Sequence, residues 1–530
     1  MMSKKTKFFW VFISALLAIF SHPMVLGKSD FSNGGFLAFI AYLPLLYFVF
    51  QAGEKKPFRL VFLFGILFYL GTLHWLYIAL NGYGHLHPLL SVGVLFILVL
   101  ILATYFTGIF AFSYWMERKL SISHFWTLPL FWVSLEWLRT HWPLGGFPWA
   151  QAGYSQWKYL TFIQVADLVG VYGVTALLIW INLAVLEIIS FIQKKEGRQK
   201  AALKIFFVLL LVLATLIYGV KQKTKVDEIS LKAPHFNLAL LQGNIPQDEK
   251  WLLEKSDEIL RIYQEMTHQA FSEQKISLVI WPEAAFPYEV ALDEEEDLEA
   301  MGSYPGDLLL GAVSYENKGR LPASTLYTPL DFPVHNSALL IKPGSKLGGA
   351  YFKHHLVPYG EYIPLKSVIP FLGKVTGQMG EFLQGTEYNL LESGAARMGM
   401  LICYEDIFPE IAQRLVKAGA NMLVNLTNDA WYGDSSALPQ HLSFSAFRAI
   451  ENRRSLVRAT NTGISASFDA SGNIWQRAPV FERKIIYDQI PLLTLSSFYA
   501  QWGDLFSYTC LAFSILLVLI ASTRHFLKKK

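Results

Sequence analysis

Cysteine is almost absent from this sequence of 530 residues, which contains only Cys403 and Cys510. A fold held together by disulfides needs several cysteine pairs, so this class of protein is excluded. Cys510 lies inside an apolar run and is predicted to be a small packing residue. Cys403 ends another apolar run and is followed at once by Tyr404, Glu405 and Asp406. Because packing alone does not require acidic neighbours, Cys403 is a candidate nucleophile.

Charged residues are also scarce: they make up 16% of the chain, whereas soluble domains carry about a quarter. The deficit lies in residues 1–220 and 505–523, and residues 221–500 have ordinary mixed polarity. We therefore predict a membrane bundle of seven helices over 1–220 and a soluble domain over 221–500. A closing transmembrane helix with a basic tail would occupy 501–530. The net charge of +4 is small and gives no basic patch typical of nucleic-acid binding.

Eight apolar segments are candidates for crossing about 30 Å of hydrocarbon, which takes about 20 residues. They are residues 8–26, 34–50, 60–80, 89–115, 122–138, 169–192, 203–220 and 505–523. The fifth is the weakest, because Glu136 and Arg139 lie near its end. The first follows a basic cluster but lacks a small-residue cleavage site, so we interpret it as a retained span and not as a signal peptide.

Lysine and arginine are distributed unevenly over the predicted loops. With the N-terminus in the cytoplasm, the inner segments carry 17 of these residues and the short outer loops carry 3. Cytoplasmic loops are enriched in them, so both termini are predicted to be cytoplasmic and residues 221–500 to lie outside. The outer loop 139–168 is rich in Trp, Pro and Gly. We expect it to form either an aromatic belt at the interface or a platform for lipid head groups.

Residues 221–500 alternate short apolar strands with amphipathic helices, which is typical of sheets covered by helices. In such sheets the chemistry gathers where strands end. Glu283 follows "LVIWP", Lys353 follows "GGAYF", and Cys403 follows "GMLI". Singly, each has an ordinary explanation as a solvated charge or a small buried thiol. Together they supply a base, a cation and a nucleophile.

This set of residues is suited to covalent catalysis. A neighbouring ammonium lowers a thiol pKa, and a carboxylate can take the thiol proton and later return it to a leaving group. Lys353 and a backbone N–H, that of Tyr404, would stabilise the oxyanion of a tetrahedral intermediate. The product of the first half would be a thioester on Cys403, which reacts with amines or water.

The order of the three residues resembles the nitrilase, or carbon–nitrogen hydrolase, superfamily. The motifs that carry the resemblance are "WPEAAFP", "YFKHHLVPYGEYIP" and "LICYEDIFPE". The resemblance implies an αββα sandwich for the soluble domain. It also implies that Glu361, eight residues after Lys353, positions the lysine and the substrate.

Together with the predicted spans, further motifs resemble the apolipoprotein N-acyltransferase family of bacterial cytoplasmic (inner) membranes. They are "LLQGNIPQDEKW", "LVPYGEYIPL", "NLTNDAWYGDS" and "LVRATNTGISA". The resemblance covers essentially the whole chain. It implies that Cys403 takes an acyl chain from a phospholipid, typically phosphatidylethanolamine, and passes it to the α-amino group of the S-diacylglyceryl cysteine of an apolipoprotein. It implies a periplasmic catalytic domain and neither a metal nor another cofactor.

The same resemblance assigns supporting roles to four residues. Tyr404 and Glu405 match positions beside the nucleophile, and Trp251 and Trp431 are expected to contact substrate. Core packing is the alternative for the two tryptophans, and a favourable charge at a helix N-terminus is the alternative for Glu405.

Two further segments carry weaker predictions. Residues 365–385 mix Gly with apolar residues and are expected either to form a lid that gates lipid entry or to pack as a small core under a long loop. Asn428 and Asp429 are expected to hold a turn.

Three other functions are compatible with parts of the sequence. A membrane-tethered amidase or nitrilase would use the same triad, with water resolving the thioester. A transporter would place ionisable residues inside several spans. The spans contain few such residues, and His74 and Glu187 are the most interior. A structural scaffold would leave the Glu–Lys–Cys set as a coincidence.

Overall fold

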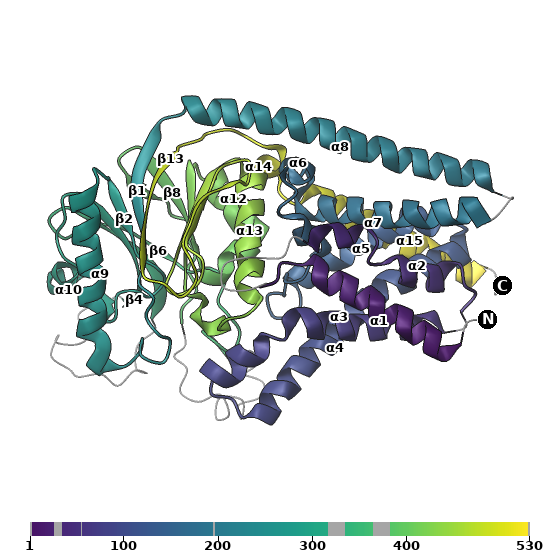
Figure 1. Cartoon of the computed structure of the whole chain (residues 1–530), viewed down its shortest axis with the longest axis horizontal. Helices are drawn as coiled ribbons and strands as arrows, with labels where there is room; N and C mark the ends of the chain where they lie inside the picture. The colour runs from purple at the N-terminus through teal and green to yellow at the C-terminus, as the bar shows by residue number, and fades with distance from the viewer. Residues whose placement is uncertain are drawn as a thin grey trace.

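A computed structural model describes residues 3–25, 34–54, 56–193, 197–315, 334–363 and 382–527. A helical bundle forms one end of the molecule and two β-sheets form the other, and both termini lie at the far end of the bundle (Figure 1). Most of the predicted lid over 365–385 lies outside the described residues. Part of the loop that precedes Lys353 also lies outside them.

Apolar helices of 8 to 35 residues make up the bundle. They are α1 (Lys4–Ser21), α2 (Leu43–Phe50), α3 (Pro57–Leu73), α4 (Pro88–Leu120), α5 (His124–His141), α7 (Ala166–Gln193), α8 (Arg198–Lys232) and α15 (Leu505–Leu527). The short helices η1 (Gly34–Phe39), η2 (Ile78–Tyr83), η3 (Ala152–Gln156) and α6 (Leu160–Ile163) lie between them. A helix overlaps each predicted span, but only four helices of the described chain, α4, α7, α8 and α15, have the length and hydropathy to cross a membrane. The count of eight crossings stays a prediction.

Helix α8 is longer than the sequence predicted. The apolar run ends near residue 220, yet the helix continues through polar turns to Lys232 and reaches β1 beside the sheets (Figure 1). There Val226 packs with Ala470 and Leu493, and the hydroxyl of Ser471 donates to the carboxylate of Asp227 (2.8 Å). Hydropathy alone missed these turns because they lie beside the sheet domain and not among apolar helices.

Two mixed sheets form the other end of the molecule. The first has the order β13 (Lys484–Pro491), β1 (His235–Gln242), β2 (Leu278–Ile280), β4 (Asp307–Tyr315), β5 (His335–Lys342), β6 (Lys346–Phe352), and β3 (Glu289–Ala291) pairs with β4. The second has the order β12 (Ile474–Arg477), β11 (Ala466–Phe468), β10 (Ser455–Thr460), β9 (Met422–Thr427), β8 (Ala396–Ile402), β7 (Leu391–Ser393). The central pairs β1–β2, β2–β4, β8–β9 and β9–β10 are parallel.

Both faces of each sheet are covered, which explains the continuous apolar strands. In β1, Leu238 and Leu240 face the core that the two sheets share. The alternate residues Ala239 and Leu241 join a second core beneath α9 (Leu253–Glu273) and α10 (Glu295–Ala300). Helices α12 (Pro409–Lys417) and α13 (Ala437–Asn452) cover the other sheet. The layers are therefore helix, sheet, sheet and helix, as the resemblance to nitrilases implied.

Helix α13 lies between the second sheet and the bundle, beside α7 (Figure 1). All of its residues are buried, since one side contacts the sheet and the other contacts membrane helices. At its C-terminus, Arg453 pairs with Asp167 of α7 (Nη2 to Oδ2, 2.6 Å), and both side chains are buried. The sheets are thus fixed to the bundle by a packed, hydrogen-bonded junction.

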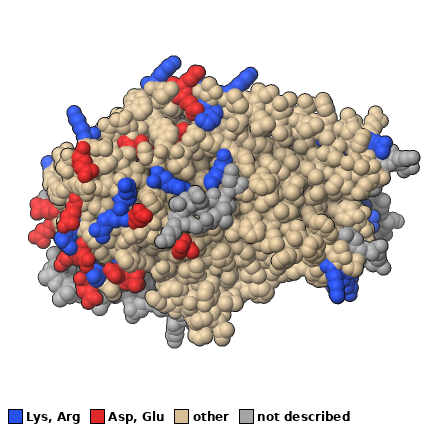
Figure 2. All heavy atoms as spheres, in the orientation of Figure 1, with Lys and Arg blue, Asp and Glu red and all other residues tan. Residues whose placement is uncertain are grey.

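Charge is distributed along the molecule in a way that fits this division. On the face shown in Figure 2, charged side chains gather over the sheets and at the far end of the bundle, and the side of the bundle between them is almost free of charge. Exposed residues of α8 in this region include Leu209, Leu213 and Ile217. An apolar band between two charged ends is what a membrane-embedded bundle requires.

Candidate active site

Cys403 is the first residue after β8, where the chain turns into the 3₁₀-helix η4 (Cys403–Ile407). Its φ is +52°, in the left-handed region that most residues avoid. The side-chain amide of Asn425 holds the turn by donating to the carbonyl oxygens of Leu401 (3.1 Å) and Cys403 (3.2 Å). A strained turn at a strand end is a common setting for a nucleophile.

The thiol of Cys403 is free and buried, with 9% of the residue exposed. It forms a hydrogen bond with the hydroxyl of Thr427. Burial and the carboxylate of Glu283 raise the pKa of Cys403, and the opposing effect of Lys353 is smaller. The sequence suggested that a lysine lowers the pKa of this thiol. Desolvation of the thiolate outweighs that effect. The resting site holds a protonated thiol and needs a base.

Glu283 lies just after β2, directly behind Pro282. Two hydrogen-bond donors orient its carboxylate. Nδ2 of Asn336 donates to Oε1 (2.8 Å), and the backbone N–H of Asn428 donates to Oε2 (3.0 Å). Gly311 of β4 allows this close approach, because a Cβ there would lie 2.6 Å from the Cα of Glu283. The carboxylate is thereby held in one orientation, near enough to Cys403 to raise the pKa of its thiol.

Lys353 follows β6 and is 1% exposed. Its Nζ donates to Oε1 of Glu361 (2.8 Å) and lies 3.6 Å from Oε1 of Glu283. Burial opposes the charge, but the two carboxylates outweigh it and raise the pKa of Lys353 above its usual range. Oε2 of Glu361 also accepts the backbone N–H of Val357 (2.8 Å). Glu361 therefore lies where the resemblance implied, in contact with the lysine.

Asn336 of β5 is a site residue that the sequence did not indicate. Its Nδ2 donates to both Glu283 and Glu361 at 2.8 Å. One amide thus keeps the two carboxylates at a fixed separation around the lysine. It sits inside the apolar strand "NSALLI", and no motif marked it.

Glu405 joins the turn that carries Cys403 to the loop that follows Lys353. Its Oε2 accepts the backbone N–H of Ile402 (2.7 Å), and its Oε1 accepts those of His354 (2.6 Å) and His355 (3.1 Å). The hydroxyl of Tyr351 also donates to it (3.2 Å). Burial raises the pKa of Glu405 to about 7. These contacts fix the segment of Cys403 relative to that of Lys353, which is more than a helix-terminal charge would do.

The other three expected site residues differ in their surroundings. Tyr404 is buried, and its ring lies edge-on to that of Phe408 at 5.2 Å. Trp251 is 55% exposed, so it is not a core residue. Trp431 is half-buried and lies 6.3 Å, between ring centroids, from Tyr83 of the bundle. Substrate contacts by the two tryptophans stay predictions.

Asn428 and Asp429 do more than hold a turn. Asn428 gives its N–H to Glu283, as described. Asp429 accepts from Arg458 (Nη2 to Oδ2, 2.8 Å) and contacts His441 (Oδ1 to Nδ1, 2.8 Å). Burial opposes ionisation, but Arg458 and His441 outweigh it and lower the pKa of Asp429. Asp406 completes this buried network by accepting from Arg458 (2.9 Å).

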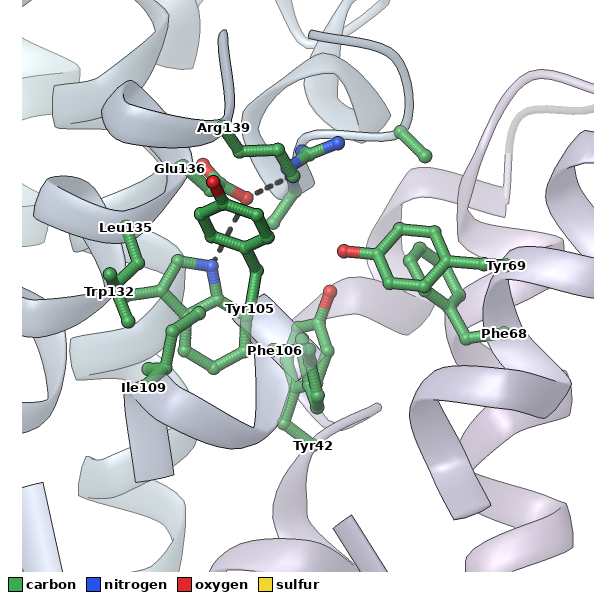
Figure 3. A pocket seen from close by; sticks show the side chains of 12 residues that line it. Tyr42, Phe68, Tyr69, Tyr105, Phe106, Ile109, Trp132, Leu135, Glu136 and Arg139 are labelled. Carbon is green, nitrogen blue, oxygen red and sulfur yellow. Dashed lines mark hydrogen bonds between the residues drawn. The ribbon is translucent and has the colours of Figure 1, made fainter. Parts of the chain in front are cut away.

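Two polar residues of α5 support the loop beneath the site. Figure 3 shows Glu136 and Arg139 at a pocket lined mainly by aromatic rings such as Tyr42, Tyr69 and Trp132. Glu136 accepts from the indole N–H of Trp132 (3.1 Å) and from the backbone N–H of Ala152 (3.2 Å). These contacts explain how a carboxylate is retained in a segment predicted to span the membrane.

Arg139 extends this support towards the sheets. Its Nη1 donates to the carbonyl oxygens of Phe147 (3.0 Å) and Trp149 (2.7 Å). The indole of Trp149 in turn donates to Gln440 of α13 (2.6 Å). Trp142 is exposed, as a belt residue would be, but Trp149 is buried. Part of the predicted belt or platform is therefore a support for α13.

Comparisons with known proteins agree with this arrangement. Residues 237–499 match the carbon–nitrogen hydrolase family, so the sheets and their site define a nitrilase-like catalytic domain. Residues 8–184 match the apolipoprotein N-acyltransferase N-terminal domain.

Curated relatives cover nearly the whole chain. Apolipoprotein N-acyltransferase of Geobacter metallireducens is 37% identical over 492 residues, which are 92% of this chain and 91% of the relative. The enzyme of Methylococcus capsulatus is 34% identical over 83% of this chain and 84% of its own. The enzyme of Pasteurella multocida is 30% identical over 97% of this chain and 95% of its own. The chain belongs to the apolipoprotein N-acyltransferase family.

Proposed function

We propose that this chain transfers a fatty acyl chain from a membrane phospholipid, through a thioester on Cys403, to the N-terminal α-amino group of the S-diacylglyceryl cysteine of apolipoproteins. The observation that carries the proposal is the buried set of Cys403, Glu283 and Lys353 in a chain of this family. A bundle with an apolar band beside the catalytic domain supports a lipid donor.

The first half-reaction forms the thioester. Glu283 takes the thiol proton, and the sulfur of Cys403 attacks an ester carbonyl carbon of the donor, proposed to be phosphatidylethanolamine. Lys353 and the backbone N–H of Tyr404 stabilise the oxyanion. The C–O bond then breaks, Glu283 returns its proton to the alkoxide, and a lysophospholipid leaves.

The second half-reaction consumes the thioester. The neutral α-amine attacks the same carbonyl carbon, and Glu283 accepts a proton from the amine. The C–S bond breaks and the proton passes to the sulfur, which restores the thiol and releases the N-acylated lipoprotein. Glu361 and Asn336 hold Glu283 and Lys353 in place through both halves. Trp251 and Trp431 would line the path of the substrates, and the mechanism needs no metal or cofactor.

The proposed topology brings both substrates to the domain. We place the protein in a bacterial cytoplasmic membrane with eight spans, both termini in the cytoplasm and residues 221–500 in the periplasm. The bundle would comprise residues 1–220, and residues 501–530 would close it. The distribution of basic residues over the loops supports this orientation. Residues 365–385 are proposed as a lid over the site.

A membrane-tethered amidase is the competing reaction for the same triad. It differs only in using water as the acceptor. The relatives over the whole chain are named as N-acyltransferases, which favours transfer to an amine.

The test is the mass of the protein after incubation with donor alone. Purified protein in detergent, given phosphatidylethanolamine and no acceptor, should gain one acyl chain that neutral hydroxylamine removes. The variant Cys403→Ala should gain nothing, whereas Cys510→Ala should be acylated normally. If folded wild-type protein stays unmodified in the presence of accessible phospholipid, the lipid-donor half is wrong and the amidase gains support.

A further inference from the structure

Lys250 is a second buried lysine at the catalytic centre, and the mechanism above does not use it. It lies in the turn between β1 and α9, where its Nζ donates to the backbone carbonyl oxygen of Glu283 (2.9 Å). The residue is buried. The charges of Glu283 and Cys403 are near enough to influence it. An ammonium thus lies within the electrostatic reach of the nucleophile and its base.

The two lysines differ in how their charges are balanced. Lys353 contacts two carboxylates, Glu361 and Glu283. Among the residues that the structure describes, Lys250 has only a neutral carbonyl as hydrogen-bond partner and no carboxylate within 4.0 Å. Burial therefore lowers the pKa of Lys250 to about 8, although Glu283 and Cys403 oppose the shift. A buried cation without a counter-ion is costly unless a ligand provides one.

We infer that Lys250 binds the phosphate diester of the phospholipid donor while Cys403 attacks the ester. This inference rests on the proposed function. In a glycerophospholipid the phosphate lies a few covalent bonds from each ester carbonyl. When such a carbonyl lies at Cys403, the phosphate therefore lies within reach of a nearby cation such as Lys250. An ammonium has three N–H donors, and one of them is used by the carbonyl of Glu283. The remaining donors suit phosphate, which lysine binds as a point charge.

The residues beside Lys250 fit an amphiphilic ligand. The ring of Trp251 lies 5.5 Å from its Nζ. Trp251, Leu252 and Leu253 are all exposed. An ammonium next to exposed apolar side chains matches a phosphate joined to glycerol and acyl chains. The diacylglyceryl cysteine of the acceptor carries no phosphate, so the contact belongs to the donor step alone.

The test compares two donors that differ in phosphate. Acylation of Cys403 is followed by intact mass, with phosphatidylethanolamine as one donor and 4-nitrophenyl palmitate as the other. Lys250→Met removes the charge and keeps most of the side-chain length. Its rate with the phospholipid should fall about 10- to 100-fold, in line with the loss of a charge-assisted contact. Its rate with the nitrophenyl ester should stay within about 3-fold, since that ester has no phosphate for Lys250 to bind.

Two variants control for indirect effects. Lys255→Met removes a half-buried lysine five residues away, paired with Glu258, and should leave both rates unchanged. Lys250→Arg keeps the charge and should retain the preference for phospholipid. An equal loss with both donors in Lys250→Met would mean that Lys250 only holds the backbone of Glu283 and would overturn the inference. If the wild-type protein is acylated by neither donor, the proposed function fails, which is a different result.

A competition experiment on the wild-type protein does not depend on how the variant folds. A dialkyl ether phosphatidylmethanol has the phosphate diester of the donor but no ester carbonyl to attack. It should inhibit acylation by 4-nitrophenyl palmitate at least about 10-fold more strongly than the matching dialkylglycerol. Equal inhibition by the two ether lipids would overturn the inference. Inorganic phosphate is the third inhibitor. If it inhibits as well as the ether phosphatidylmethanol, the site is a general anion site and its assignment to a lipid is wrong.

Discussion

At the residue scale, the site depends on how its charges are separated as well as on which residues carry them. Asn336 contacts Glu283 and Glu361 with one amide group. Without it, the two carboxylates around Lys353 would lose their common donor. The separation of base and cation would then be set only by repulsion and by backbone contacts.

Replacement of Asn336 should therefore impair catalysis more than folding. In Asn336→Ala we expect the rate of Cys403 acylation to fall about 100-fold, because small misplacements of catalytic groups have effects of this size. The thermal midpoint should change little by comparison. Single-turnover intact mass and thermal unfolding in detergent measure the two effects, and Asn389→Ala, at an exposed loop position, is the control. Full activity in Asn336→Ala would contradict the role given to this residue.

The sequence led to the proposed charged and nucleophilic residues of the site but gave no sign of their partners. Glu283, Lys353 and Cys403 each follow a recognisable apolar strand, and Glu361 lies in a motif. Asn336 has no such signal, because a single amide at the start of a strand resembles any other polar residue at a strand end. Lys250 follows Asp248 and Glu249, so in sequence it resembles part of a solvated charge cluster.

At the element scale, Glu405 connects the two segments that carry Cys403 and Lys353. It accepts three backbone N–H groups from the turn after β8 and from the loop after β6. These segments are far apart in the chain, and their shared carboxylate couples the position of Cys403 to that of Lys353.

The raised pKa of Glu405 gives a pH dependence with a definite sign. The ordinary pKa of a glutamate is 4.5, and burial raises the pKa of Glu405 in the folded chain to about 7. Between these values the folded chain retains a proton that the unfolded chain has released, so the contribution of this group to the free energy of unfolding decreases as the pH rises. The thermal midpoint of the wild type minus that of Glu405→Gln should therefore decrease from pH 4.5 to pH 7, because only the wild type loses this contribution. In the exposed control Glu299→Gln this difference should stay constant, and a constant difference for Glu405→Gln would refute the assignment.

The elements themselves were predicted to different degrees. Strands β2, β6 and β8 lie at the apolar runs that precede Glu283, Lys353 and Cys403 in the sequence. Spans were predicted from hydropathy, which responds to lipid exposure, so the polar turns at the end of α8 were missed. The kink in α7 was also missed. It occurs at Gly170, whose φ is +64°, and a Cβ there would lie 2.7 Å from the ring of Tyr499.

At the scale of the whole molecule, catalysis on lipids requires that the sheets stay fixed above the bundle. Arg453, just after α13, donates to Asp167 through Nε (3.0 Å) and Nη2 (2.6 Å). It also donates to the side chain of Gln164 (2.7 Å). All three side chains are buried at the junction.

Loss of this arginine should weaken the junction and the whole fold. In Arg453→Met, Asp167 would keep Tyr218 and Gln222 as donors but lose its counter-ion. Breaking a buried ion pair in this way costs about 3–5 kcal/mol. Thermal unfolding in detergent should show a large decrease in midpoint. Arg261→Ala, which removes an exposed partner of Glu265, should change it very little. Similar midpoints for the two variants would show that the junction contributes little to stability.

The sequence by itself determined the family and the main architecture of this protein, because hydropathy and strand-end motifs are local patterns in the chain. It indicated the apolar helical bundle and the sheets covered by helices, and it led to the proposal of the Glu–Lys–Cys set. Only the tertiary structure decided which groups surround that set. Asn336 between the carboxylates, Glu405 between two loops, Lys250 without a counter-ion and α13 buried at the junction all result from contacts between distant segments. Such contacts depend on three-dimensional packing, and no pattern within a single segment encodes them.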